Sequence, residues 1–282
     1  MKERIKWIIV IVLYYTGISY ISFLINISFS KLLVVNYHCT PEKFSHIFEQ
    51  QLAFFRRYYK NCSDLDLLNI NKFKKKLFDK PYLIISFDDG LRSNYDYSIP
   101  LLEKFGFSGW FFVCPTFINS SRIDDLTANR IFPKQRYDDN RYCIDCDELS
   151  GLSNRHYIGS HTSNHHRFTV NDSDEIIKLE VIHSKSELSS MLNLKINSFA
   201  WVGGEENHYT KAANKMICLN YDFVFTTLVN AKYSNVNFKN IPRTNIESSF
   251  SKELFLFQIS GILDLIYIFK RTRVNKLLNI KK

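Results

Sequence analysis

The sequence lacks several patterns that would assign a protein to a functional class. It contains no Gly-x-Ser-x-Gly segment, so nothing supports the nucleophilic serine of an α/β-hydrolase. It has no internal repeat and no low-complexity stretch, which argues against a repeat protein. The net charge of +9 would suit a nucleic-acid partner, but the lysines are scattered and no nucleic-acid-binding motif accompanies them. We therefore expect no nucleic-acid partner.

Cysteine gives little support to a disulfide scaffold or a structural zinc site. The six cysteines do not follow the spacing of a small secreted scaffold. Cys143 and Cys146 form a single Cys-x-x-Cys pair. Without a second pair, a zinc knuckle or a redox site is the less favoured interpretation.

The sequence does contain apolar, strand-like runs that alternate with helix-like segments. A chain of 282 residues with 45% hydrophobic residues can bury the core of one catalytic domain. Strand-like runs lie at 31–37, 82–87, 109–113, 156–159, 197–202, 221–226 and 238–242, and helix-like segments at 44–59, 97–105, 174–192 and 208–218. This alternation predicts an α/β fold. The polar segment 115–147 is expected to be a long excursion that borders the cleft.

Two short stretches hold the residues with the clearest chemistry. Asp88 and Asp89 directly follow the apolar run 81–87, where a buried strand is expected to end. His161 and His165 lie four positions apart in a later segment. A carboxylate and two imidazoles hold a divalent ion such as zinc and leave a position open for water. The second carboxylate can then serve as the base that accepts a proton from that water.

Each stretch alone is weak evidence for a site. Asp-Asp-Gly is a common turn sequence, and two histidines four positions apart also occur on exposed helices and loops. Because the two stretches occur together, and the first follows a hydrophobic strand, a metal site is the favoured interpretation.

These stretches resemble two motifs of the polysaccharide deacetylase (NodB-homology) family, which belongs to carbohydrate esterase family 4. Residues 86–90, Ser-Phe-Asp-Asp-Gly, are similar to its first motif, and residues 161–165, His-Thr-Ser-Asn-His, match its second. The resemblance covers about residues 31–250, the expected catalytic domain. It implies a distorted, incomplete (β/α) barrel whose site opens at the carboxyl ends of the strands.

The resemblance also implies roles for individual residues. Asp88 would be the general base, and Asp89, His161 and His165 would bind a divalent metal, zinc first, with cobalt or nickel as alternatives. Thr162 would brace the histidine loop through a hydrogen bond, and His166 would have a structural role outside the ligand set.

Three features depart from the family pattern or leave a role open. Residues 198–204 resemble the third motif but have no proline; the resemblance gives the Trp201 main-chain amide the role of stabilising the oxyanion. No Leu-x-x-His element supplies a general acid. His38 is expected to line the pocket or act as an acid, with a structural role as the alternative. Arg243 is expected to orient Asp88 or contact the substrate, with a surface salt bridge as the alternative.

The function implied is metal-dependent hydrolysis of N-acetyl groups of amino sugars in a polysaccharide or oligosaccharide. O-acetyl ester hydrolysis would use the same residues. A catalytically silent carbohydrate-binding relative is an alternative of a different class. A membrane-tethered component that contacts a glycan-synthesis partner is a further alternative. The four intact motif residues argue against the silent relative. The sequence does not determine the oligomeric state.

Both ends of the chain are apolar. No charged residue occurs between Trp7 and Ser30, so we expect residues 1–30 to associate with a membrane. They would span it as an uncleaved anchor, with the catalytic domain outside the cytoplasm, or form a helix in the interface or against the domain. Residues 251–282 are expected to form an apolar helix followed by a basic tail, suited to an anionic membrane face or to solvent.

Overall fold

The computed structural model describes residues 2–119, 141–152 and 154–279. Most of the excursion expected at 115–147 therefore lies outside the described residues. The strands are β1 (Leu32–Tyr37), β2 (Lys60–Asn61), β3 (Tyr82–Phe87), β4 (Gly109–Val113), β5 (Tyr157–Ser160), β6 (Ser198–Ala200), β7 (Phe223–Thr226), β8 (Ile241–Pro242) and β9 (Thr244–Asn245). Each of the seven predicted strand runs overlaps one of them. The sequence did not predict β2 and β9, which have two residues each and no apolar run to mark them.

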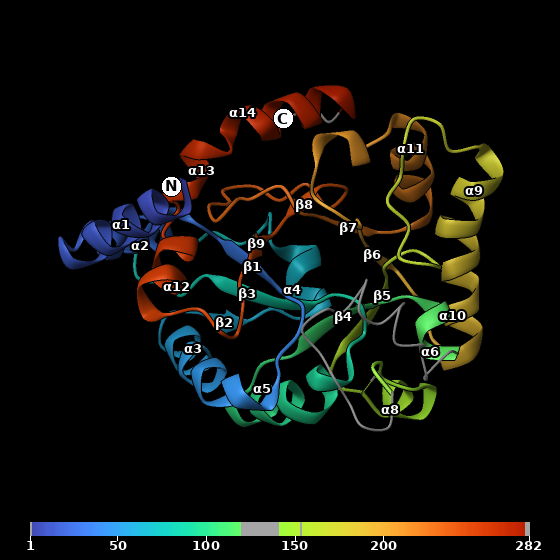
Figure 1. The fold of residues 1–282 in the computed structure, drawn as a ribbon, viewed down its shortest axis with the longest axis horizontal. Coiled ribbons are helices and arrows are strands. Elements are labelled where there is room, and N and C mark those ends of the chain that lie inside the picture. Colours follow the sequence, from blue (N-terminus) through green and yellow to red (C-terminus); the bar gives the residue numbers. More distant parts are fainter. Residues whose placement is uncertain (1, 120–140, 153, 280–282) are drawn as a thin grey trace.

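The strands form one parallel sheet that curves into a nearly closed barrel (Figure 1). The order is β8-β7-β6-β5-β4-β3-β1-β9, with β2 paired to β3 outside this path. The two end strands, β8 and β9, are separated in the sequence by Arg243 alone. One short segment thus joins both edges of the sheet, and the predicted distorted, incomplete (β/α) barrel is confirmed.

Successive side chains of the strands alternate between two cores, as strand geometry requires. Leu32 and Val34 of β1 belong to a cluster inside the barrel that also includes Leu67. Leu67 comes from the short helix α4 (Asp64–Asn69), which Figure 1 draws within the ring of strands. Farther along the same inward-facing series come Asn36 and Ser86, which are buried and polar. The interior therefore changes from apolar at the amino ends of the strands to polar at the carboxyl ends.

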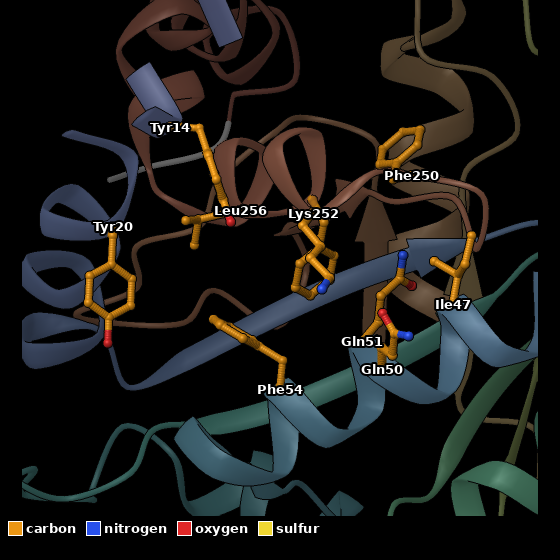
Figure 2. A pocket seen from close by; sticks show the side chains of 10 residues that line it. Tyr14, Tyr20, Ile47, Gln50, Gln51, Phe54, Phe250, Lys252 and Leu256 are labelled. Atoms are coloured by element: carbon orange, nitrogen blue, oxygen red, sulfur yellow. The ribbon is translucent and has the colours of Figure 1, made fainter. Parts of the chain in front are cut away.

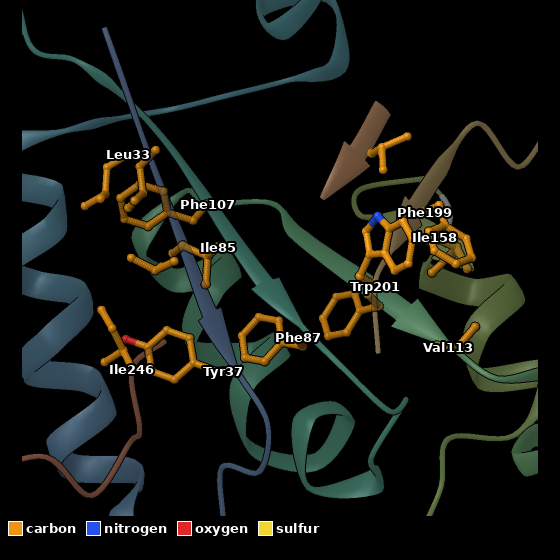
Figure 3. Close-up of a cluster of buried hydrophobic side chains, with 14 of the residues drawn as sticks. Leu33, Tyr37, Ile85, Phe87, Phe107, Val113, Ile158, Phe199, Trp201 and Ile246 are labelled. Carbon is orange, nitrogen blue, oxygen red and sulfur yellow. The ribbon is translucent and has the colours of Figure 1, made fainter. Parts of the chain in front are cut away.

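The other core lies between the strands and the surrounding helices. Figure 3 shows part of it, with Leu33, Ile85 and Phe199 of the sheet among its aromatic and aliphatic members. Covering helices include α3 (Ser45–Tyr58), α5 (Ile99–Phe105), α8 (Cys146–Leu152), α9 (Asp174–Lys178), α10 (Ser184–Leu192) and α11 (Lys211–Asn220). Between α9 and α10 the helix widens into one π turn, Leu179–His183. The helix predicted at 174–192 is thus present with this local irregularity.

The amino-terminal apolar segment forms two helices instead of one. α1 (Lys2–Tyr15) and α2 (Ile18–Phe29) are separated by Gly17, whose φ of 77° breaks the helical path. Among the described residues no single helix has the length and apolar character to cross a membrane; α1 and α2 meet that test only as a pair, which is bent by 73°. A hollow of about 280 Å³ lies between these helices, α3 and α12 (Lys252–Ile259) (Figure 2).

The carboxyl-terminal segment is also divided. It forms α12 (Lys252–Ile259), α13 (Ile262–Ile266) and α14 (Ile268–Leu277). Gly261, with a φ of 83°, separates the first two. The single apolar helix expected there is thus replaced by three short ones, and α14 lies along the outside of the barrel (Figure 1).

Candidate active site

The carboxyl ends of β3 and β5 bring two carboxylates and two imidazoles together. Nε2 of His165 lies 3.1 Å from Oδ1 of Asp89, and Nε2 of His161 lies 3.6 Å from the same oxygen. Asp88 is adjacent, with Oδ2 3.9 Å from Nε2 of His161. Asp88, Asp89 and His161 are buried, and His165 is 20% exposed. The residues that the sequence pattern singled out thus form one cluster.

The turn after β3 depends on backbone conformations that few residues adopt. Asp89 has a φ of 73° and Gly90 one of 68°, both in the left-handed region that favours glycine. A β-carbon on Gly90 would lie 2.9 Å from the Val113 side chain. Glycine is therefore required at position 90 by both its φ and its close approach to β4.

His161 is oriented by a main-chain carbonyl. Its Nδ1 lies 2.9 Å from the carbonyl oxygen of Ala200 at the end of β6. That partner accepts only, so Nδ1 carries the proton and donates it. Nε2 is then unprotonated and faces Asp89, as a metal ligand requires. Burial lowers the pKa of His161, more than the neighbouring carboxylates raise it, which also keeps the ring neutral.

A buried glutamate shapes the loop that carries His165. Glu180, on the π turn, accepts hydrogen bonds from the main-chain amides of Ser163 and Asn164 at 2.9 and 3.0 Å. Its other oxygen accepts from the Asn164 side chain at 2.8 Å. These contacts hold the segment between the two histidines in one conformation, in which His165 has a φ of 55°.

Thr162 and His166 also act within the histidine loop. The Thr162 hydroxyl accepts a hydrogen bond from the His166 main-chain amide at 2.9 Å. This is the brace expected from the resemblance. The His166 ring instead pairs with Asp172 at 2.8 Å, in keeping with a structural role outside the ligand set.

Three of the residues fit a divalent cation. Asp89, His161 and His165 each offer one ligand atom, and these atoms all lie within 4.8 Å of one another. Oδ1 of Asp89 is buried and has no hydrogen-bond partner of good geometry among the described residues, although it lies close to both imidazoles. A buried carboxylate oxygen without a donor is costly, and a cation bound there would satisfy it. One carboxylate and two neutral imidazoles also form a ligand set typical of zinc.

Asp88 is held in place by Arg243. The guanidinium donates to Oδ1 at 2.7 Å and to Oδ2 at 2.9 Å, and Asn36 donates to Oδ2 at 3.0 Å. Burial by itself would raise the pKa of Asp88, but the charge of Arg243, followed by that of His161 and by the hydrogen bonds of Arg243, holds it below its usual value. Asp88 is therefore an ionised carboxylate at neutral pH.

The position of Arg243 does not fit two of the three roles considered for it. Its side chain is fully buried, so the surface salt bridge is wrong, and a side chain without accessible surface does not fit direct contact with a substrate. Arg243 is buried because it lies between β8 and β9 and its side chain extends into the barrel, where it meets Asp88 at the polar carboxyl end. The geometry fits the remaining role, orientation of Asp88.

The role expected for the main-chain amide of Trp201 is wrong. That amide donates a hydrogen bond to the carbonyl oxygen of Phe225 at 3.0 Å, because the pairing of β6 with β7 continues past Ala200. It is therefore not free to stabilise an oxyanion. The indole lies on the outer side of the sheet, buried against Phe168 and Tyr209.

His38 lies at the end of β1, half-buried. The main-chain amide of Asp88 donates a hydrogen bond to the carbonyl oxygen of Tyr37, the residue before His38, at 3.1 Å. His38 therefore lies beside the segment that carries both carboxylates. This position suits a residue that lines the site.

Two residues of the site were not assigned a role from the sequence. Asn36 contacts both Asp88 and Arg243. A polar residue inside the apolar run 32–37 was an available signal, since such residues are buried only with partners. Glu180 had no signal, because a helical glutamate is most often exposed.

The chain is similar to known proteins both in sequence and in fold. The model of the polysaccharide deacetylase family matches residues 75–221. No curated protein matches. Similar solved structures include the Streptococcus pyogenes deacetylase PplD in complex with acetate, with a TM-score of 0.62 and 18% identity over 82% of this chain and 99% of that chain. IcaB from Ammonifex degensii has a TM-score of 0.60 and 17% identity over 82% and 97% of the two chains. A de-N-acetylase from Aggregatibacter actinomycetemcomitans has a TM-score of 0.62 and 14% identity over 78% and 96%. At these identities the likeness is one of fold.

Proposed function

Because the chain belongs to the polysaccharide deacetylase family, we propose that it hydrolyses N-acetyl groups of amino sugars in a glycan with the help of a divalent metal. Family membership makes the chain a hydrolase of carbon–nitrogen bonds. The observation that carries the finer proposal is the cluster of Asp89, His161 and His165, with the ionised Asp88 beside it.

Asp89, His161 and His165 would hold the metal, and Zn²⁺ fits this ligand set best. A bound divalent ion would polarise the acetyl carbonyl and lower the pKa of a water molecule at the open position. The protein prepares its ligand atoms for this role. Ala200 fixes the proton on Nδ1 of His161, and Glu180 holds the loop of His165 in place.

Asp88 would accept the proton of the attacking water. Its Oδ2 accepts hydrogen bonds from Arg243 and Asn36, whereas Oδ1 accepts one, from Arg243. A carboxylate offers about four acceptor positions, so one position on Oδ1 is left for the water. The bidentate contact with Arg243 fixes the plane of the carboxylate. Asp88 therefore enters the reaction ionised and oriented.

The leaving amine needs a proton when the carbon–nitrogen bond breaks. His38 is the residue we propose for this step, because it is half-buried and lies beside the segment that carries both carboxylates. A histidine can hold a proton near neutral pH and donate it to the departing nitrogen.

The test is release of acetate from N-acetylglucosamine oligomers by the purified full chain, with and without added zinc. Asp88→Asn and His161→Ala are the variants, and Asp147→Asn, on the surface helix α8, is the matched control. We expect release that zinc supports, that both site variants abolish and that the control retains. Zinc bound by wild type but not by His161→Ala, without any acetate release, would instead favour an O-acetylated substrate or a binding role. Wild type that binds no zinc would overturn the proposed site.

A further inference from the structure

The amino-terminal helices expose an apolar surface that the domain leaves uncovered. The exposed apolar residues of α1 and α2 include Ile5, Trp7, Ile8, Ile9, Ile11, Val12, Tyr15, Ile18, Ile21, Leu24, Ile25 and Phe29. On α1 they cover somewhat more than half of the circumference, at about 100° per residue, while Val10, Leu13 and Tyr14 on the remaining side are buried or half-buried. A helix that is apolar all round is normally found inside a protein or in a membrane. An exposed patch of this kind therefore calls for a partner.

α2 is attached to the domain by its other face. Phe23 is fully buried, and the Ser22 hydroxyl donates to the Ser260 carbonyl at 2.9 Å. The Asn26 side chain donates to the Ala231 carbonyl at 3.2 Å. Phe23 and these polar side chains thus fix α2 on the barrel, and the remaining apolar residues, such as Ile21 and Ile25, are exposed.

A second segment beside α2 combines lysines with exposed apolar residues. Residues 72–80, Lys-Phe-Lys-Lys-Lys-Leu-Phe-Asp-Lys, carry five lysines. At the centre, Leu77 is 57% and Phe78 is 94% exposed. Nζ of Lys75 donates to the carbonyl of Ser28 on the last turn of α2 at 3.0 Å. The contact places this lysine-rich loop next to the apolar surface, although the two are far apart in the sequence.

We propose that α1, α2 and the loop 72–80 form one surface that binds an anionic phospholipid bilayer and lies in its interface. Apolar side chains would enter the acyl boundary, while exposed lysines such as Lys74 and Lys76 contact the headgroups. Helices of 14 and 12 residues are about 21 and 18 Å long, shorter than a hydrocarbon core of about 30 Å. Since α2 is fixed to the domain and the pair is bent by 73°, a position along the interface fits better than a crossing.

This surface lies at the end of the barrel opposite the candidate site. α2 leads into β1, and the loop 72–80 leads into β3, a parallel neighbour of β1. Asp88 follows the other end of β3. Six residues of β-strand span about 20 Å. A protein bound through this surface would therefore present its candidate site away from the bilayer.

The test is flotation of the purified full chain with vesicles of phosphatidylcholine alone and of phosphatidylcholine mixed with phosphatidylglycerol. One variant combines Lys74→Glu with Lys76→Glu, and another combines Leu77→Ser with Phe78→Ser. The control makes the same charge change at two exposed lysines of α11, Lys211→Glu with Lys215→Glu. We expect preference for the anionic vesicles, binding at least about tenfold weaker for the lysine variant, weaker binding for the apolar variant and wild-type binding for the control.

Circular dichroism of each variant separates lost binding from lost folding. Equal binding of all the folded variants would overturn the proposal, as would self-association of the chain without vesicle binding. Protease access to an N-terminal epitope, in membranes from expressing cells, tests the orientation. We expect the epitope and the catalytic domain on the same side; an epitope on the opposite side would show a spanning segment and overturn the interfacial position.

Discussion

The two ends of the barrel use charge in opposite ways. At the carboxyl end, Asp88 and Arg243 are buried and hold each other with two hydrogen bonds. At the amino end, Lys74 and Lys76 are exposed beside apolar side chains. Buried charges interact strongly and depend on geometry, whereas exposed charges are screened by salt and act nearly additively. The first arrangement suits a reaction at one point, and the second suits attachment to a broad anionic surface.

The strongest way to test the carboxyl end is to remove the proposed base. Asp88→Asn should lower kcat for acetate release by about 10²–10⁴, because the amide cannot accept the proton of water. Steady-state kinetics measures this loss, and zinc titration should show metal still bound. His165→Ala should instead weaken metal binding. An Asp88→Asn variant that retains wild-type kcat would exclude Asp88 as the base.

Two ion pairs, one buried and one exposed, allow the effect of burial on stability to be compared. Arg243→Met leaves the Asp88 carboxylate buried without its partner and should lower the free energy of unfolding by about 3–5 kcal/mol. Arg273 pairs with Glu206 at the surface, where both side chains are exposed. Arg273→Met should cost less than about 1 kcal/mol. Urea denaturation measures both, and similar costs for the two variants would contradict the assigned difference in burial.

The support of the histidine loop can be tested apart from the ligands. The Glu180 carboxylate accepts three hydrogen bonds from N–H groups. In Glu180→Gln one carboxylate oxygen becomes an NH₂ group, which is itself a donor, so at least one of these hydrogen bonds is lost. We expect zinc affinity to fall about 10–100-fold, the usual effect of losing a group that orients metal ligands. Glu175→Gln, an exposed change on α9, is the control. Unchanged zinc affinity in a folded Glu180→Gln protein would leave Glu180 with a structural role only.

The smallest expected effect concerns α4 at the amino end of the barrel. Ser63 and Asp66 form a capping box at its start, so Ser63→Ala should cost about 1 kcal/mol. Burial would raise the pKa of Asp66, but hydrogen bonds from Ser63 and Tyr82 lower it overall. A lowered folded-state pKa gives stability above the unfolded value and loses it as the pH falls. The difference between wild type and Asp66→Asn should therefore shrink below about pH 4; a constant difference in urea denaturation across that range would contradict it.

Part of this structure could be predicted locally. Continuous apolar runs marked the major strands, because a strand of a parallel sheet is buried on both faces. β2 and β9 were missed because two residues carry no such pattern. The break at Gly17 and the division of residues 251–282 were also missed, since apolar composition marks a helix but does not fix where its axis turns.

The assignments around the site failed for a different reason. The Trp201 amide was expected to be free, but its availability depended on how far the pairing of β6 and β7 continues. The burial of Arg243 depended on which two strands close the barrel. Neither fact is encoded near those residues in the sequence.

The sequence by itself determined the α/β class, the family and the small set of candidate metal ligands, because these follow from short-range patterns of polarity and spacing. Membrane association of the first 30 residues stays a prediction. Only the tertiary structure decided which distant groups meet: Arg243 with Asp88, Glu180 with the histidine loop, and Lys75 with the end of α2. Such contacts join residues far apart in the chain, so they exist only once the barrel has closed and its helices have packed.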